Sequence, residues 1–111
     1  MDNNNEMNLS EATDALCTAE SAVESMDEMI KLFGVFDENL KVISAETGAR
    51  IIAAGDCIRI EGSAEAAELA KTVVDKLLIT VRRGENVDRS RIRYAVDLAK
   101  EGNADLITEL E

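Results

Sequence analysis

The spacing of apolar residues predicts a short strand and then a helix in the first third of the chain. A largely apolar run over residues 29–33, which includes Lys31, stops at Gly34, which can bend the chain without steric cost. Asp37 then offers a side chain that can accept a backbone N–H as a helix N-cap. Apolar or small side chains follow at helical spacing as far as Gly48. They are Phe36, Leu40, Ile43 and Thr47. We therefore predict a strand over residues 29–33 and a helix over residues 37–47 that buries Phe36.

The next two apolar runs predict a β-hairpin. Residues 49–54 and 57–61 are separated by Gly55-Asp56, a pair that suits a type II′ turn between strands. In the second run Ile58 and Ile60 alternate with polar side chains, so one face of this strand is expected to be buried and the other solvated.

Two helices are predicted in the second half of the chain. Ser63 is a favourable N-cap for a helix from Ala64 to about Arg83, with Gly84 as its terminator. Asp88 can cap a last helix that ends before Gly102. The first helix has the strongest apolar stripe of the sequence, formed by Ala66, Leu69, Ala70, Val73, Val74, Leu77, Leu78 and Val81. The second has a shorter stripe of Ile92, Ala95, Val96 and Ala99.

These elements predict an α+β fold of the order β-α-β-β-α-α, in which helices cover one face of a small three-stranded sheet. The folded domain is expected over residues 29–102. Residues 1–28 are expected to be an acidic tail that is largely disordered or a frayed helix. Apolar residues at heptad spacing leave a coiled-coil seam as the alternative there; they are Leu9, Ala12, Leu16, Ala19, Val23, Met26 and Ile30. Residues 103–111 are expected to be a linker that is cut short.

The charge of the chain is strongly negative but unevenly distributed. The net charge is −11, of which the first 28 residues supply −8 through eight acids and no base. Residues 82–93 carry five arginines against two acids, a local excess of +3. The acidity of the whole chain argues against casual nucleic-acid binding, while residues 82–93 form one basic stretch.

The sequence lacks the residues that several kinds of catalytic and binding site require. There is no histidine, which excludes a Ser/His/Asp triad, and no G-x-x-x-x-G-K-[ST] phosphate loop. Cys17 and Cys57 form no C-x-x-C pair, and we expect two free thiols in a reducing cytoplasm. The first six residues lack the basic and apolar regions of a signal peptide, so we expect none, and no apolar run approaches the roughly 20 residues that a membrane span needs. We expect no catalysis, cofactor or metal site in this chain.

Residues 29–81 resemble a KH domain, a module for single-stranded nucleic acid with a G-x-x-G loop. The matching stretches are Leu32-Phe-Gly-Val-Phe-Asp37, Leu40-Lys-Val-Ile43, Thr47-Gly-Ala-Arg-Ile51, Ile58-Arg-Ile-Glu-Gly62 and Ser63-Ala-Glu-Ala66. The departure lies in the loop. Asp37 replaces the second glycine, and Val35 and Phe36 stand where basic residues would suit a phosphate clamp.

A more extensive resemblance, over roughly residues 29–111, is to the N-terminal domain of bacterial PhoH-like ATPases. It rests on the motifs at residues 33–41 (F-G-x-x-D-E-N-L-K), 47–51, 55–62 (G-D-x-I-x-I-x-G), 77–84 (L-L-x-x-x-R-R-G) and 92–102 (I-R-x-A-V-x-L-A-K-E-G). The resemblance implies a cytoplasmic protein, linked by name to phosphate starvation, in which a P-loop ATPase domain follows this segment. ATP and Mg²⁺ are expected in that domain.

Two functions remain open for this segment. In the first, it binds single-stranded RNA and presents it to the ATPase domain. In the second, it is a protein-interaction, oligomerisation or regulatory domain that docks on the ATPase domain or assembles with copies of itself. The candidate nucleic-acid contacts are Gly34, Val35, Phe36, Asp37, Asn39, Lys41, Arg50, Arg59, Arg82 and Arg83. For the arginines, ion pairing on a solvated surface is the alternative explanation.

Overall fold

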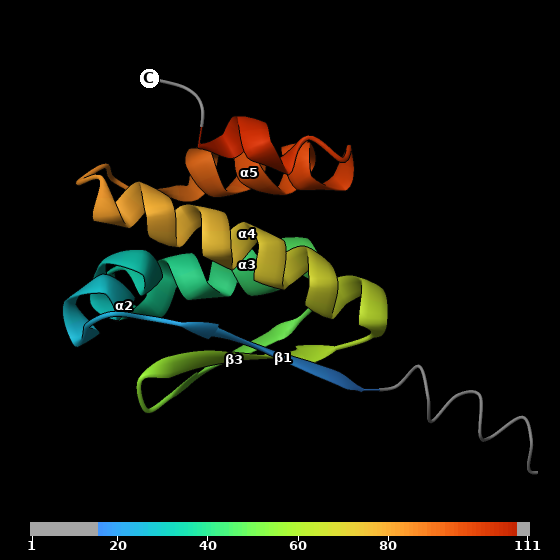
Figure 1. Cartoon of the computed structure of the whole chain (residues 1–111), viewed down its shortest axis with the longest axis horizontal. Helices are drawn as coiled ribbons and strands as arrows, with labels where there is room; N and C mark the ends of the chain where they lie inside the picture. The colour runs from blue at the N-terminus through green and yellow to red at the C-terminus, as the bar shows by residue number, and fades with distance from the viewer. Residues whose placement is uncertain (1–15, 109–111) are drawn as a thin grey trace, which may run out of the picture.

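Three antiparallel strands form a sheet with helices on one of its faces (Figure 1). The computed structural model describes residues 16–108. Its elements are β1 (Cys17–Ala22), α2 (Met26–Phe33), the 3₁₀ turn η1 (Val35–Asp37), α3 (Glu38–Thr47), β2 (Arg50–Ala54), β3 (Cys57–Gly62), α4 (Ala64–Arg82), α5 (Arg89–Lys100) and the 3₁₀ turn η2 (Ala104–Ile107). The sheet order is β1-β3-β2, with β3 central and antiparallel to both neighbours. The predicted α+β class and three-stranded sheet are confirmed, and the fold is compatible with a KH-like arrangement.

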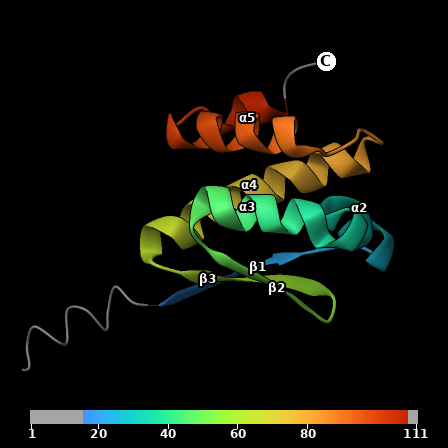
Figure 2. The same cartoon turned by 180° about the vertical axis from the view of Figure 1, so that it is seen from behind.

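The helices lie in two layers above the sheet, as Figures 1 and 2 show from opposite sides. Helices α2, α3 and α4 cover one face of the sheet, and α5 with η2 packs on the far side of α3 and α4. None of the helices within residues 16–108 has the length and apolar content to cross a membrane.

The predicted hairpin and its alternation are confirmed. On the inner face of the sheet Ala19, Ile60 and Ile51 lie opposite one another across the three strands. On the outer face the same is true of Glu20, Arg59 and Ile52. Gly55 has φ +69°, as the first position of a type II′ turn requires.

The predicted caps of the two long helices are also confirmed. The Ser63 hydroxyl accepts a hydrogen bond from the N–H of Ala66 at 3.1 Å, and Asp88 accepts one from Arg91 at 2.9 Å. Gly84 has φ +82° and follows the last turn of α4. The apolar stripes predicted for these helices are largely buried, so both helices bury the face that the sequence indicates.

Residues 29–33 belong to helix α2, so the predicted strand there is wrong. Helix α2 begins after Ser25, whose hydroxyl accepts a hydrogen bond from the Glu28 N–H at 3.2 Å. Met29, Leu32 and Phe33 are buried while Ile30 is exposed, which is helical periodicity rather than alternation. The Ser-x-x-Glu pattern that begins at Ser25 is the sequence signal that identifies this helix start.

The first strand is instead Cys17–Ala22, within the predicted acidic tail. The expectation of a frayed helix or a heptad seam is therefore wrong over these residues; Leu9 and Ala12 lie outside the described residues. Strand β1 pairs along its whole length with β3. The Lys71 ammonium on α4 also donates a hydrogen bond to the Glu20 carbonyl at 2.9 Å. Long-range pairing thus determines the conformation of a segment with weak local preference.

The end of the described chain is packed rather than free of partners. Turn η2 lies against α4 and α5, Ile107 is buried in the core, and Asp105 pairs with Lys76 on α4 at 3.1 Å. The expectation of a linker is therefore wrong for residues 104–107, while residues 109–111 lie outside the described part.

We expect Ile60→Ala to lower the free energy of unfolding by about 2–5 kcal/mol, because it opens a cavity beneath α4. Ile60 is fully buried at the centre of the sheet. Urea unfolding followed by circular dichroism measures the change. Leu106→Ala is the matched control at an exposed apolar residue and should stay within about 0.5 kcal/mol of the parent protein. Equal effects of the two substitutions would contradict the central place of β3 in the core.

Candidate functional site

The loop between α2 and α3 has an unusual backbone. Gly34 has φ +81°, and the two non-glycine residues Phe36 (φ 55°, ψ 32°) and Asp37 (φ 58°, ψ 28°) are both left-handed. Such conformations cost non-glycine residues of the order of 1–2 kcal/mol each. Consecutive left-handed residues at an exposed loop therefore mark a place where the chain stores strain.

This loop exposes apolar side chains at its tip. Phe36 is 90% exposed and Val35 is 71% exposed. The prediction that Phe36 is buried is wrong, because the two left-handed residues interrupt the helical phase that would place it beside Leu40 and Ile43. Asp37 does stand at the N-cap position of α3, which begins at Glu38, but the predicted side-chain cap is wrong, since the Asp37 side chain makes no capping hydrogen bond.

Asn39 has a structural role and is not a surface contact. It is buried, and its amide Nδ2 donates a hydrogen bond to the carbonyl of Val87 at 3.0 Å, which ties α3 to the segment between α4 and α5. Gly34 makes room for it: a Cβ at position 34 would lie 2.8 Å from this Nδ2 atom. Gly34 is therefore required both for its backbone conformation and for the packing of Asn39.

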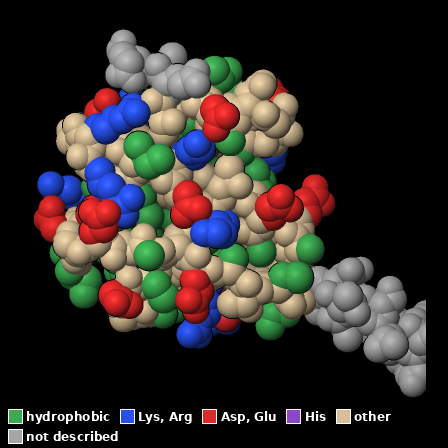
Figure 3. All heavy atoms as spheres, in the orientation of Figure 1, with side chains coloured by type: hydrophobic (Ala, Val, Ile, Leu, Met, Phe, Trp, Pro, Cys, Tyr) green, Lys and Arg blue, Asp and Glu red, His purple; other side chains and the backbone are tan. Residues whose placement is uncertain are grey.

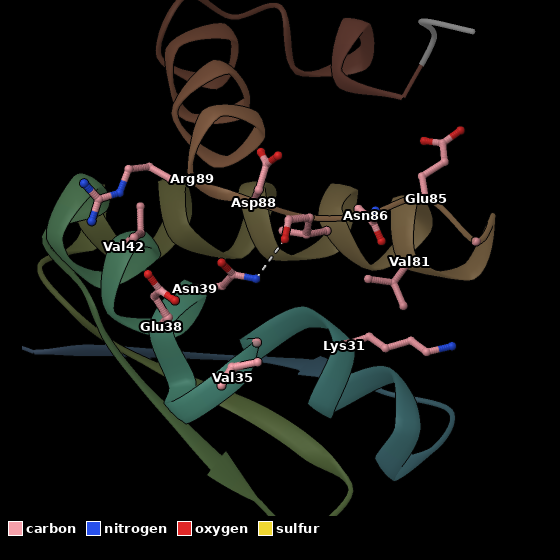
Figure 4. Close-up of a pocket in the computed structure, with 13 residues that line it drawn as sticks. Lys31, Val35, Glu38, Asn39, Val42, Val81, Glu85, Asn86, Asp88 and Arg89 are labelled. Atoms are coloured by element: carbon pink, nitrogen blue, oxygen red, sulfur yellow. Dashed lines mark hydrogen bonds between the residues drawn. The ribbon is translucent and has the colours of Figure 1, made fainter.

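A cleft of about 520 Å³ lies between the start of α3 and the segment that joins α4 to α5 (Figure 4). The Asn39–Val87 hydrogen bond crosses it, and Lys31 and Arg89 lie at its two ends. Three carboxylates and two cations line it, Glu38, Glu85 and Asp88 against Lys31 and Arg89, and its described lining includes no hydroxyl or thiol group. Within residues 16–108 no three carboxylate or thiol side chains converge to hold a metal ion. The cleft therefore has the character of a mixed-charge surface rather than of a nucleophilic centre.

Arg82 fastens α4 to α2. Its guanidinium donates two hydrogen bonds to the Glu28 carboxylate, at 2.9 and 3.1 Å, and the Glu28 side chain is only 12% exposed. These hydrogen bonds hold the pKa of Glu28 below its ordinary value of 4.5, and a further one from the Glu24 N–H acts in the same direction. Arg82 was a candidate nucleic-acid contact, but its guanidinium is committed to this ion pair.

The other candidate arginines do not gather at the loop. Arg50 and Arg59 lie on the outer face of the sheet, away from the helices, and each is 4.0 Å from a carboxylate, on Glu61 and Glu20 respectively. Arg83 donates a hydrogen bond to the Thr108 carbonyl. In Figure 3 acidic and basic side chains are interspersed over the face shown, without a continuous basic area.

Ion pairs also occupy two arginines of the basic stretch: Arg91 pairs with Glu85 at 3.0 Å and Arg93 with Glu46 at 3.2 Å. Lys41 is exposed on α3 one turn after Asp37, and within the described residues it forms no ion pair. Of the predicted contacts, the structure thus brings together Gly34, Val35, Phe36, Asp37 and Lys41.

Two exposed apolar residues near this loop were not predicted as candidate contacts, although both belong to the possible heptad seam. Met26 and Ile30 are four residues apart on the solvent side of α2. The sequence signal was available, since Met29, Leu32 and Phe33 already account for the buried face of a helix beginning at Ser25.

The comparisons with known proteins give one informative similarity. The chain is 28% identical over 88 residues to a PhoH-like protein of Bacillus subtilis (strain 168). The match covers 79% of this chain but 28% of that protein, so the chain spans about a quarter of the length of the curated relative it matches. No family model matches the chain, and no solved structure matches it. The similarity supports a relation to the PhoH-like family.

We expect Glu28→Gln to weaken the dependence of stability on acid pH. The pKa of Glu28 is lowered in the folded protein, so its contribution to stability is complete above the ordinary value of 4.5 and is lost as the pH falls through the lower, folded value. The variant should therefore be less stable than the parent at neutral pH and should lose less stability on acidification. Urea midpoints measured over a pH series test this. Glu24→Gln is the control, because Glu24 is more exposed and lies 3.8 Å from Arg82; parallel pH curves for parent and Glu28→Gln would refute the expectation.

We expect Phe36→Asn to stabilise the protein by about 0.5–1 kcal/mol, since asparagine tolerates the left-handed conformation and the exposed ring has little packing to lose. Phe36→Val should destabilise it, because a β-branched residue is more strained at this position. Chemical unfolding of the three proteins gives both values. A loss of stability in Phe36→Asn would mean that the ring packs against the protein and is not held outward.

Proposed function

We propose that this chain is the non-catalytic N-terminal binding module of a PhoH-like ATPase, and that residues 34–37 contact the ATPase part of the same protein. The observation that carries this proposal is the exposure of Val35 and Phe36 on a strained loop. Strain of this kind persists where the surrounding structure holds it, and it clusters at functional sites. Exposed aromatic side chains are typical centres of protein interfaces.

The charges around the loop oppose a phosphate clamp. Asp37 and Glu38 follow Phe36 directly, and neither forms an ion pair within residues 16–108. Neutralisation of phosphates by free cations supplies most non-specific affinity for nucleic acid. Here Arg82, Arg91 and Arg93 are already paired with carboxylates. The electrostatic support for RNA binding is therefore weak at this loop.

A partner within the same polypeptide is consistent with the similarity. The matched segment is a minor part of the PhoH-like relative, so most of that protein lies outside it. A module joined to its partner by a short linker has an effective concentration in the millimolar range, so a small apolar contact such as Val35 and Phe36 is sufficient for docking.

Single-stranded RNA is the second candidate, and the exposed ring of Phe36 is the observation that favours it. Stacking of a base on an exposed aromatic ring contributes about 1–3 kcal/mol per base. Lys41, which forms no ion pair within residues 16–108, offers a cation further along α3.

To test the proposal, the ATPase part of the full-length protein is added as a separate polypeptide to the ¹⁵N-labelled 111-residue chain. We expect saturable amide shifts at residues 34–38, and an affinity about tenfold or more lower for Phe36→Ala, as for a hot-spot aromatic residue. Leu106→Ala, at another exposed apolar side chain, should bind like the parent. Absence of binding, or equal affinity of the parent and Phe36→Ala, would overturn the proposal.

A parallel titration with short single-stranded RNA pools distinguishes the second candidate. We expect no saturable shifts at residues 34–39 at about 150 mM salt, where long-range charge attraction is screened. Saturable shifts at residues 34–39 that are lost in Phe36→Ala would show that the loop binds RNA, and the proposed protein contact would be given up.

A further inference from the structure

Exposed apolar side chains are concentrated on one segment of the molecule. Seven large apolar residues are exposed within residues 16–108, and four of them fall at positions 26–36. Met26 and Ile30 lie one turn apart on the same side of α2. Gly34 follows Ile30 by a further turn and donates its N–H to the Ile30 carbonyl at 2.9 Å. Val35 and Phe36 come directly after it, so the four residues, named here the α2–loop surface, follow one another along α2 into the loop.

The charged residues around the α2–loop surface have a net negative charge. Counted with the charged residues of the adjoining cleft, seven carboxylates stand against four cations, a net charge of −3; they are Glu24, Asp27, Glu28, Asp37, Glu38, Glu85 and Asp88 against Lys31, Lys41, Arg82 and Arg89. Asp27 pairs with Lys31 at 3.1 Å, and Glu28 pairs with Arg82. Asp37 and Glu38 thus remain next to Phe36 without an ion pair among the described residues; Arg89 lines the same cleft as Glu38, and Lys41 follows on α3.

This charge distribution selects the class of partner. A second copy docking through the same surface would bring two negatively charged rims together, and such like-charge contacts are unfavourable. A nucleic-acid backbone would meet the same repulsion. A partner segment whose apolar residues are flanked by basic residues avoids both repulsions. The net charge of −11 of this chain would also attract such a segment over a distance.

We infer that the α2–loop surface binds a basic amphipathic helix of a protein partner. Its apolar residues would cover Met26, Ile30 and Phe36, and its Lys or Arg residues would meet Asp37 and Glu38. The helical form follows from the surface itself, because apolar residues spaced by a turn along α2 match the ridge of a second helix. The inference rests on the proposed function in that the partner is a protein, and it adds the chemistry of that partner.

The test uses two synthetic helices of equal length and identical leucine spacing, one with lysine and one with glutamate at the polar positions. Each is titrated into the ¹⁵N-labelled chain at about 150 mM salt, so that contact rather than long-range attraction is measured. We expect saturable shifts over residues 26–38 with the lysine helix and none with the glutamate helix. Ile30→Lys should weaken binding at least tenfold, and Asp37→Asn combined with Glu38→Gln about threefold to tenfold, as expected for a hot spot and for charges at its rim.

Leu106→Lys is the matched control for Ile30→Lys, since both place a lysine at an exposed apolar position and change the net charge equally. It should leave the affinity for the lysine helix within about twofold of the parent, because a charge remote from the contact acts only through long-range attraction, which this salt concentration screens. Equal binding of the two helices, or equal effects of Ile30→Lys and Leu106→Lys, would overturn the inference. If the ATPase part docks through Phe36 while the lysine helix fails to bind, the inference falls and the proposed function stands. If the lysine helix binds this surface while the ATPase part does not dock, the proposed partner falls instead.

Discussion

The packing of α4 between the sheet and α5 is the constraint on which the rest of this structure depends. Its apolar residues are buried on more than one side, because β1 and β3 lie beneath it while α5 and η2 lie above. Ala67 and Ala70 are small and almost fully buried, and such residues let a helix approach its neighbours closely. Below α4, Ile58 and Ile60 fill the centre of the inner face of the sheet. A helix buried on two sides sets the spacing of all three layers.

The arrangement of the candidate site follows from that core. Helix α2 is anchored by Met29, Leu32 and Phe33 inside and by the Glu28–Arg82 ion pair at its edge. Helix α3 is tied to the segment between α4 and α5 through Asn39. The loop between them has both ends fixed, which explains how two left-handed residues persist and why Val35 and Phe36 point outward. A rigid base thus presents a small apolar tip.

The distribution of charge over the folded protein differs from its distribution along the sequence. Residues 82–93 form a basic stretch along the chain, but Arg82, Arg91 and Arg93 each meet a carboxylate in space, and two of these carboxylates come from α2 and α3. The negative charge at the loop remains less compensated, since Asp37 and Glu38 have no such partners within the described residues. The electrostatic character of the candidate site is therefore nearer to that of the whole acidic chain than to that of its arginine-rich segment.

The sequence by itself determined the elements whose signals are local: the hairpin with its Gly55 turn, and the helices capped by Ser63 and Asp88. Tertiary structure decided the rest. Strand β1 exists because β3 pairs with it some 40 residues later, and a segment as short as residues 29–33, with four apolar residues around Lys31, cannot be assigned to strand or helix from periodicity alone. The exposure of Phe36 and the pairing of Arg82 with Glu28, 54 positions away, were likewise invisible along the chain. Caps and turns depend on neighbours within a few residues, whereas burial and ion pairing depend on which distant segments the core brings together.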